Sequence, residues 1–310
     1  MRCLVTGGAG FIGSNLVDAL LARGDEVTVV DNLTTGRRAN LEPGLAAGAE
    51  LVELDIRDGE ALSRLAGEKR PQAIFHLAAQ IDVRKSLADP FFDAGVNVGG
   101  TANVLEAARA SECGRVVSIS TGGAIYGEGE GQQLPLPEDA PIAPLSAYGQ
   151  SKFAAEGYLS LYERLYGLSG VSLRLGNVYG PRQDPLGEAG VIAIFCGLIK
   201  EGGQPTVYGD GTQTRDYIYV GDVVSAALAA GDSAATGAIN IGTGKETNVL
   251  ELVEALRGIS GRDDFEAQLA PPRTGEVQAI SIDTTRAERE LGWRAEMDLD
   301  EGLRVTLDSI

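Results

Sequence analysis

Short apolar runs alternate with amphipathic segments from residue 2 to residue 175. The runs are bounded by glycine, proline and charged residues, a pattern typical of buried strands. They predict strands at residues 2–6, 26–30, 50–54, 73–77, 115–120 and 171–175. Helical periodicity is clearest between them at 14–23, 89–110 and 147–166. Alternating strands and helices predict an α/β fold with a doubly wound parallel sheet, whose ligands bind at the carboxyl ends of the strands.

A glycine-rich turn follows the first predicted strand and leads into the first predicted helix. Gly7, Gly10 and Gly13 have the spacing of a dinucleotide-binding turn, in which the backbone approaches a pyrophosphate at a helix N-terminus. Asp31 ends the second strand, where a carboxylate accepts hydrogen bonds from the adenosine ribose and repels a 2′-phosphate. This context predicts a Rossmann domain that binds NAD rather than NADP, although the arginine pair at 37–38 could weaken that preference.

Tyr148 and Lys152 are the strongest candidates for acid–base chemistry. A free phenol has a pKa of about 10, so it exchanges protons poorly at neutral pH. An ammonium on the same helical face favours the phenolate and lowers that pKa. Residues four apart on a helix are neighbours, and both positions fall in the segment predicted to be helical.

Composition excludes several classes of protein. The chain has 310 residues and a net charge of −18, which is the wrong sign for a nucleic-acid-binding protein. No apolar run approaches 18 residues, so we expect no membrane span. The three cysteines are isolated, which is typical of the cytoplasm. The only histidine, His76, leaves no multi-histidine metal site and is expected to be structural, so no metal is predicted.

With these residues identified, the chain resembles the extended short-chain dehydrogenase/reductase family, and within it the NAD-dependent nucleotide-sugar epimerases. The resemblance covers nearly the whole chain. Besides the glycine turn, Asp31 and the Tyr148/Lys152 pair, the matching positions are 76–79, 97, 100–101, 120–121, 174–182, 208–211, 215–220, 222, 240–242, 273, 275–276 and 291–293.

The resemblance implies NAD as cofactor and a set of residues that hold it. The third strand ends at Asp55 and Ile56, where a contact to the adenine amide is expected. The implied cofactor-binding residues are Gly7, Gly10, Phe11, Ile12, Gly13, Asp31, Asn32, Asp55, Ile56, Leu77, Ala78, Ala79, Asn97, Ser120, Tyr148 and Lys152.

The resemblance implies that Tyr148 takes the proton from a sugar hydroxyl. It also implies that Lys152 forms a hydrogen bond with the nicotinamide ribose and lowers the pKa of the tyrosine. A serine or threonine beside them shares a hydrogen bond with the sugar hydroxyl. Its usual position falls on Gly122 in this chain. We therefore expect the neighbouring Thr121 to supply the hydroxyl, with Ser120 as the alternative.

The implied partner is a UDP-sugar substrate. Asn177 is expected at the diphosphate and Arg215 at a phosphate. Thr206 and Tyr208 are expected beside the base. The implied substrate-binding residues are Arg84, Ser86, Gly122, Asn177, Val191, Thr206, Tyr208, Arg215, Arg273 and Glu276.

Two positions limit which reaction the site can catalyse. Related dehydratases carry carboxylates just before the turn that contains Tyr126, because elimination of water needs an acid and a base there. This chain has Gly123 and Ala124 instead, and neither can move a proton. The expected reaction is inversion at C4 of a UDP-hexose of the glucose/galactose series through a 4-keto intermediate, with NAD regenerated.

Alternatives remain open. Arg84 and Lys85 could meet a C6 carboxylate, which would suit 4-epimerisation of UDP-glucuronate. A nucleotide-sugar dehydrogenase or ketoreductase would use the same residues, and a non-catalytic NAD-sensing protein would need neither Tyr148 nor Lys152.

The domain organisation is also expected from the resemblance. Residues 1–176, together with about 220–260, should form the NAD-binding domain, and residues 177–310 a smaller nucleotide-sugar-binding α/β domain interleaved with it. Helices near 91–110 and 147–166 are expected to pair with their copies in a homodimer.

Overall fold

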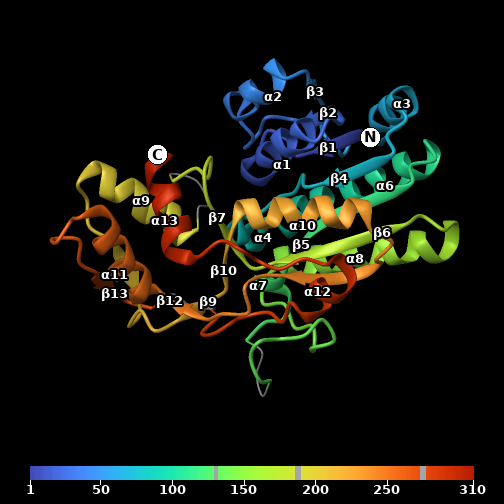
Figure 1. Cartoon of the computed structure of the whole chain (residues 1–310). Coiled ribbons are helices and arrows are strands. Elements are labelled where there is room, and N and C mark those ends of the chain that lie inside the picture. Colours follow the sequence, from blue (N-terminus) through green and yellow to red (C-terminus); the bar gives the residue numbers. More distant parts are fainter. Residues whose placement is uncertain (129–131, 186–189, 273–276) are drawn as a thin grey trace.

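A seven-stranded parallel sheet forms the centre of the larger part of the molecule (Figure 1). The computed structural model describes residues 1–128, 132–185, 190–272 and 277–310. The strands lie in the order β11-β6-β5-β4-β1-β2-β3, so the order reverses between β1 and β4, where this fold binds its ligand. Their bounds are β1 Arg2–Thr6, β2 Glu26–Asp31, β3 Glu50–Glu53, β4 Ala73–His76, β5 Arg115–Thr121, β6 Gly170–Leu175 and β11 Gly237–Ile241.

The predicted fold class and the six predicted strands are confirmed. Each predicted strand is present, with its ends shifted by no more than one residue. The seventh strand, β11, was not predicted, because its short apolar run gives little signal by itself. It becomes a strand by pairing in parallel with β6, from Gly237 opposite Val171 to Ile241 opposite Leu175.

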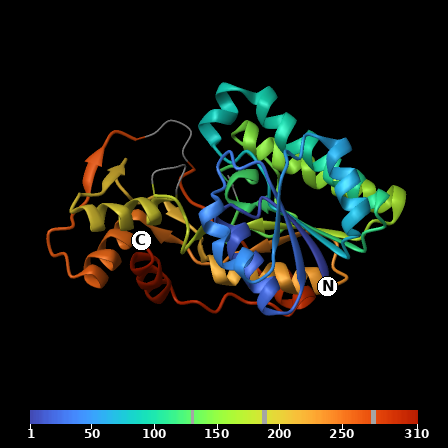
Figure 2. The same cartoon turned by 90° about the horizontal axis from the view of Figure 1, so that it is seen from above.

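Helices cover both faces of the sheet (Figure 2). On one face lie α3 Gly59–Lys69, α6 Thr101–Ala110 and α8 Ala147–Tyr166. On the other lie α1 Phe11–Ala22, α10 Val220–Asp232 and α12 Thr285–Leu291. A short 3-10 helix (Arg38–Leu41) and α2 (Glu42–Ala46) follow β2. No helix in the described ranges is both long and apolar enough to cross a membrane.

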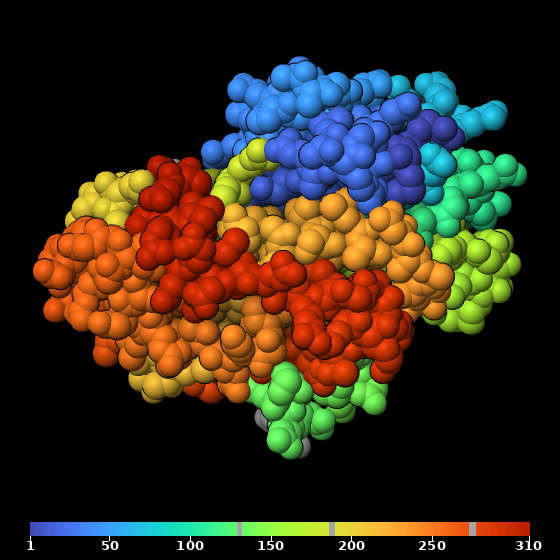
Figure 3. Space-filling model, viewed as in Figure 1, coloured from blue at the N-terminus to red at the C-terminus, as the bar shows by residue number. Residues whose placement is uncertain are grey.

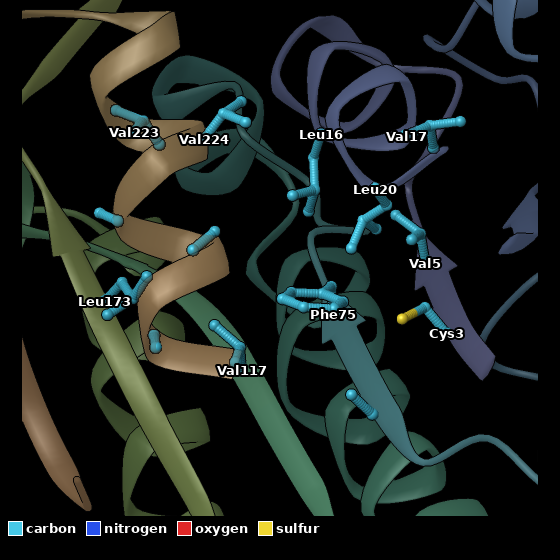
Figure 4. Close-up of a cluster of buried hydrophobic side chains, with 14 of the residues drawn as sticks. Cys3, Val5, Leu16, Val17, Leu20, Phe75, Val117, Leu173, Val223 and Val224 are labelled. Atoms are coloured by element: carbon cyan, nitrogen blue, oxygen red, sulfur yellow. The ribbon is translucent and has the colours of Figure 1, made fainter. Parts of the chain in front are cut away.

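Phe75 occupies the middle of the core between the sheet and the helices α1 and α10 (Figure 4). Leu16 and Leu20 of α1 approach it from one side. Gly231 of α10 comes so close that a Cβ there would lie 2.8 Å from the Phe75 ring. Apolar burial of this kind is the main favourable contribution to folding, and it fixes α1, with its N-terminus, on the sheet.

The helix predicted over 89–110 is divided. Asp89 caps its start as predicted, since its carboxylate accepts a hydrogen bond from Phe92 N at 2.9 Å. The chain then forms α5 (Pro90–Ala94), a π-helical turn (Gly95–Gly100) and α6. A π turn holds an extra residue and often marks a functional site. Gly100 in this turn allows the side chain of Ile56 to pack closely against the backbone, because a Cβ at Gly100 would lie 2.5 Å from Ile56 Cδ1.

Helix α8 matches its predicted bounds. Ser146 caps its N-terminus by accepting a hydrogen bond from Gly149 N at 3.0 Å, and Gly167 ends it in the left-handed conformation. The short helix α4 (Val83–Ala88) and α5 pack against α8. The helix that carries Tyr148 is therefore held at its ends by caps and along its length by packing.

The smaller part of the molecule has its own apolar core. It contains α9 (Val191–Glu201), α11 (Val249–Ser260) and α13 (Leu299–Asp308), with Phe265 among its fully buried side chains. Three short strand pairs complete it: β7 Asn177–Tyr179 with β10 Tyr217–Tyr219, β8 Thr206–Tyr208 with β13 Gln268–Ala270, and β9 Thr214–Arg215 with β12 Thr247–Asn248. The C-terminal segment runs from α12 on the sheet to α13 on the smaller part (Figure 3).

Candidate active site

A cavity of about 500 Å³ opens at the carboxyl ends of the sheet strands, and residues from both parts of the molecule line it. This volume is within the usual range for a small-molecule site. The predicted site residues that line it are Gly7, Gly10, Phe11, Ile12, Gly13, Asp31, Asn32, Asp55, Ile56, Leu77, Ala78, Ala79, Ser120, Thr121, Tyr148, Lys152, Asn177 and Arg215.

The glycine turn forms a cradle that side chains would fill. Gly7 has a positive φ of 72°, and a Cβ there would lie 2.5 Å from Ala78 N. A Cβ at Gly13 would lie 2.2 Å from the Gly7 carbonyl oxygen. Helix α1 begins after Gly10 without a side-chain cap, so its first amide groups are available at the cavity. This geometry fits the pyrophosphate of NAD.

Asp31 is oriented by the backbone around it. Its Oδ2 accepts a hydrogen bond from Ala9 N at 2.9 Å, and its Oδ1 accepts one from Leu33 N at 2.8 Å. Burial raises the pKa of Asp31, and the two backbone hydrogen bonds oppose that rise. Each oxygen retains a lone pair, so the carboxylate can also accept from ribose hydroxyls. Arg37, which could have attracted a 2′-phosphate, forms an ion pair with Asp184 instead.

Tyr148, Lys152 and Thr121 meet inside the cavity. The Thr121 hydroxyl is hydrogen-bonded to the Tyr148 phenol. The Lys152 ammonium donates to the Ile119 carbonyl oxygen at 2.8 Å. The second candidate hydroxyl, Ser120, instead donates to Glu156 at 2.5 Å. The geometry thus favours Thr121 over Ser120 as the hydroxyl beside the phenol, and its catalytic role stays a prediction.

Burial governs the protonation of these groups. It raises the pKa of Tyr148 to about 12, the hydrogen bond with Thr121 opposes this rise, and the charge of Asp93 adds to it. Burial lowers the pKa of Lys152 to about 8, while Asp93 and Glu156 oppose that fall. The sequence led us to expect a lowered tyrosine pKa from Lys152. In this structure burial is the larger effect, and it acts in the opposite direction.

His76 is structural, in line with the expectation from sequence. Burial lowers its pKa to about 3, so the ring is neutral. Thr101 donates to the Asn97 carbonyl oxygen at 2.6 Å, so its hydroxyl can accept from His76 Nε2 at 2.9 Å. His76 Nδ1 then accepts from the Thr6 hydroxyl at 2.7 Å, and Thr6 in turn accepts from Ala78 N at 3.3 Å. The ring therefore joins the ends of β1 and β4 to α6.

Asn97 does not line the cavity, and its assignment to the cofactor stays a prediction. Its Oδ1 accepts from Gln80 N at 2.8 Å, and its Nδ2 lies 3.0 Å from the Gln80 carbonyl oxygen. The same Nδ2 donates to Ser151 Oγ at 3.0 Å, and Ser151 donates to the Tyr148 carbonyl oxygen at 3.0 Å. Asn97 thus connects the loop after β4 to the first turn of α8.

Ser86 and Gly122 also lie outside the cavity lining. The buried Ser86 hydroxyl donates to the Val83 carbonyl oxygen at 2.7 Å and accepts from Tyr148 N at 3.0 Å. It therefore positions the backbone of Tyr148, and its predicted role in substrate binding stays a prediction. Gly122 begins the short helix α7 (Gly122–Ile125) and faces Ile282, whose Cδ1 would lie 2.8 Å from a Cβ at Gly122.

The other predicted substrate residues that the structure describes are not part of the lining either. Arg84 is exposed on α4, and Val191 packs against the core of the smaller part, although its neighbours Gly190 and Ile192 line the cavity. Thr206 is exposed and Tyr208 half-buried on β8. Arg273 and Glu276 lie outside the described residues.

Residues missed by the sequence interpretation complete the wall. Tyr179, Gln183 and Tyr217 line the cavity, and both tyrosines fall in runs that carried the resemblance. A buried ion pair anchors α8 behind it: Arg174 Nη2 lies 2.7 Å from Glu156 Oε2. No local pattern marks that pair, because its members are brought together by the packing of α8 on β6.

The described part of the chain contains no group of acidic, histidine or cysteine side chains that could hold a metal ion. Among the residues that the structure describes, the titratable and cationic side chains lining the cavity are Asp31, Asp55, Tyr148, Lys152, Tyr179, Arg215 and Tyr217. The only carboxylates among them therefore lie at the ends of β2 and β3, on the cofactor side.

Comparison with known proteins gives matches over nearly the full length. Residues 3–242 match the model of the NAD dependent epimerase/dehydratase family. The UDP-glucose 4-epimerase of Mycolicibacterium smegmatis is 46% identical over 310 residues, which cover 99% of this chain and 98% of the relative.

Two solved structures are similar throughout. That of the Thermotoga maritima UDP-glucose 4-epimerase with UDP-glucose has a TM-score of 0.95 at 44% identity, covering 100% of this chain and 98% of the other. That of the Thermus thermophilus UDP-glucose 4-epimerase in complex with NAD has a TM-score of 0.91 at 45% identity, again covering 100% and 98%.

The glycine cradle generates a first prediction. Gly13→Ala should push the turn open, because the new Cβ would meet the Gly7 carbonyl oxygen at 2.2 Å. We expect NAD to bind at least about tenfold more weakly, equivalent to about 1.4 kcal/mol. The measurement is the NAD released from the purified protein on denaturation. Gly67→Ala is the control, since its Cβ would meet nothing within 4 Å. Full NAD retention in Gly13→Ala would contradict the assignment.

Proposed function

The chain belongs to the NAD-dependent epimerase/dehydratase family, and from this premise we propose that it is a nucleotide-sugar 4-epimerase acting on a UDP-hexose. NAD is its cofactor, consistent with the relative whose structure contains it. A UDP-hexose of the glucose/galactose series is supported by the relative whose structure contains UDP-glucose.

One observation carries the choice between epimerase and dehydratase. Gly123 and Ala124 line the cavity next to Thr121, at the positions where elimination would need an acid and a base. A Cβ at Gly123 would already lie 3.3 Å from Asn177 Oδ1, so Asn177 fills the cavity wall at the place where a dehydratase would carry a carboxylate. Among the described residues, neither Gly123 nor Ala124 can remove a proton from C5 of a 4-keto sugar formed here, so the course that we propose for it is reduction back at C4.

The residues at the centre can then perform one proton transfer out and one back. The glycine turn and Asp31 would hold NAD, which would supply the hydride acceptor and donor for C4. Tyr148 takes the proton of the sugar 4-hydroxyl, and the hydrogen bond from Thr121 stabilises its phenolate. Lys152 is available to the nicotinamide ribose and carries a positive charge below its pKa of about 8.

We propose that the diphosphate of the sugar nucleotide lies against the smaller part of the molecule. Asn177 and Arg215 line the cavity there and suit the diphosphate and a phosphate. We assign Thr206 and Tyr208 to the base and Arg273 with Glu276 to the nucleoside ribose on the family resemblance. We therefore propose an NAD-binding domain of residues 1–176 with α10, β11 and α12, which pack on the sheet, and a sugar-nucleotide domain made by the rest of the C-terminal half. This differs from the division expected from the sequence, because α11 packs in the smaller part.

We also propose a homodimer and a cytoplasmic location. Side chains exposed on α4, α5 and α8 form an apolar surface: Leu87, Phe91, Phe153, Tyr158, Leu165 and Tyr166. Such a surface suits pairing of these helices with a second copy. The three cysteines are free and buried, as a reducing compartment allows.

The test of function uses the purified protein without added NAD. Incubation with UDP-glucose, UDP-N-acetylglucosamine and UDP-glucuronate, followed by chromatographic separation of the C4 epimers, should show interconversion in the glucose series. Tyr148→Phe should reduce kcat at least about a hundredfold, because it removes the acid–base group. Consumption of added NAD without any epimer formed would instead identify a dehydrogenase.

The hydroxyl beside Tyr148 can be assigned with a matched pair of variants. Thr121→Val keeps the shape but removes the hydrogen bond to the phenol, so kcat should fall about tenfold to a hundredfold. Ser120→Ala removes the hydrogen bond to Glu156, so it should cost about 1.5 kcal/mol of stability with little change in kcat. Steady-state kinetics and thermal unfolding distinguish the two. A larger loss of kcat in Ser120→Ala would reverse the assignment.

The dimer is tested by placing a charge on the apolar surface. Tyr158 and Leu165 lie two turns apart on α8 and share a face. Leu165→Lys should weaken self-association at least about tenfold, equivalent to about 1.4 kcal/mol, as measured by sedimentation. Leu269→Lys is the control, because Leu269 on β13 is similarly exposed at 65% against 61%. A monomeric unmodified protein, or equal dissociation of both variants, would rule this interface out.

A further inference from the structure

Asp93, on α5, has a buried carboxylate that neither the sequence nor the proposed reaction accounts for. Its residue is only 1% exposed. Its Oδ1 accepts hydrogen bonds from Gln80 Nε2 at 2.8 Å and from Asn97 Nδ2 at 3.2 Å. Its Oδ2 is also buried and has no hydrogen-bond partner among the residues that the structure describes. A buried carboxylate with a free oxygen is costly, so it calls for a compensating charge or a function.

Asp93 acts on the charges of the proposed acid–base pair. Helix α5 packs directly against α8. Asn97 bonds both Asp93 and Ser151, and Ser151 bonds the Tyr148 carbonyl oxygen, so Asp93 lies close behind the first turn of α8. Its negative charge raises the pKa of Lys152 and also that of Tyr148.

The other charged groups around this centre act differently. Glu156 also supports the Lys152 ammonium, but it is held in a buried ion pair with Arg174. His76 faces Lys152 and is neutral. On α4, Arg84 and Lys85 are exposed, and Lys85 lies over the Phe92 ring. Asp93 is therefore the carboxylate that acts on both members of the pair without an ion-pair partner among the described residues.

We propose that Asp93 is an electrostatic positioning residue of the active site: its buried carboxylate keeps Lys152 positively charged and opposes early ionisation of Tyr148, and so sets the pH range in which the pair works. The proposal rests on the proposed function, because Tyr148 and Lys152 are the acid–base pair of that reaction. It goes beyond it by assigning a further group that touches neither sugar nor cofactor.

The physical reason is the dry surroundings of α8. Lys152 is buried, and burial alone would favour its neutral form. A fixed negative charge in a poorly screened interior opposes that loss far more effectively than a surface charge does. The same charge disfavours a second negative charge on the phenol. Removing it should lower both pKa values, so both limbs of a bell-shaped pH profile should move to lower pH.

The asparagine variant removes this charge while preserving the hydrogen bonds. In Asp93→Asn the amide oxygen can take the place of Oδ1 and keep both accepted bonds, and the amide nitrogen replaces the unpartnered Oδ2. Asp93→Ser, a smaller neutral acceptor, covers the case in which the asparagine variant does not fold. Asp308→Asn, exposed near the end of α13, is the control that removes one negative charge far from the site.

Two measurements decide the proposal. The first is kcat of the NAD-containing enzyme as a function of pH. We expect both limbs to move down by about one pH unit in Asp93→Asn, and neither limb to move in Asp308→Asn. The second measurement needs no turnover. It is the absorbance of tyrosinate as a function of pH in each protein, from which the absorbance of the corresponding Tyr148→Phe variant is subtracted. We expect about tenfold more Tyr148 phenolate in Asp93→Asn at a given pH below its midpoint.

The outcomes separate this proposal from the proposed function. A lower maximal kcat with unmoved limbs and an unchanged phenolate titration would show that Asp93 is merely structural and overturn the proposal. An equal shift in Asp308→Asn would overturn it as well. If the unmodified protein does not epimerise any sugar, the proposed function fails, and the absorbance titration still decides whether Asp93 controls Tyr148.

Discussion

The position of α8 against the sheet is the constraint on which the active site depends. This helix buries polar groups, and every one must be matched where water is excluded. Glu156 meets this demand through its ion pair with Arg174 of β6 and the hydrogen bond from Ser120 of β5. Lys152 meets it at the Ile119 carbonyl oxygen. These contacts fix the rotation of α8 about its own axis and its position along the sheet, so that Tyr148 lies in the cavity wall.

A second buried network joins this helix to the cofactor side. His76 connects the end of β1 to α6, and Asn97 connects the loop after β4 to α8. Gly7 packs against the Ala78 backbone so closely that no side chain could separate them. The glycine turn and α8 are thereby parts of one rigid frame. The distance between a pyrophosphate and the phenol is set by the sheet, not by flexible loops.

The choice of reaction depends on a feature of a different kind. The family to which the chain belongs includes both epimerases and dehydratases. Gly123 and Ala124 add no proton-transfer group to the site, and Asn177 closes the wall beside them. The small residues at these two positions determine which reaction follows, because a carbonyl intermediate reacts only with the groups that surround it.

The pattern of apolar runs by itself determined six strands, the helix 147–166 and the fold class, because local periodicity and caps report burial directly. The glycine spacing, Asp31 and the Tyr148/Lys152 pair were readable for the same reason: their geometry is local. The break in the helix at Asn97, the place of Ser86 and the protonation of Tyr148 were decided only by the tertiary structure. Each depends on groups far apart in sequence, such as Asp93 against α8 and Thr121 against the phenol. Electrostatic effects in a buried site follow from distance and exclusion of water, and the chain acquires both only when it folds.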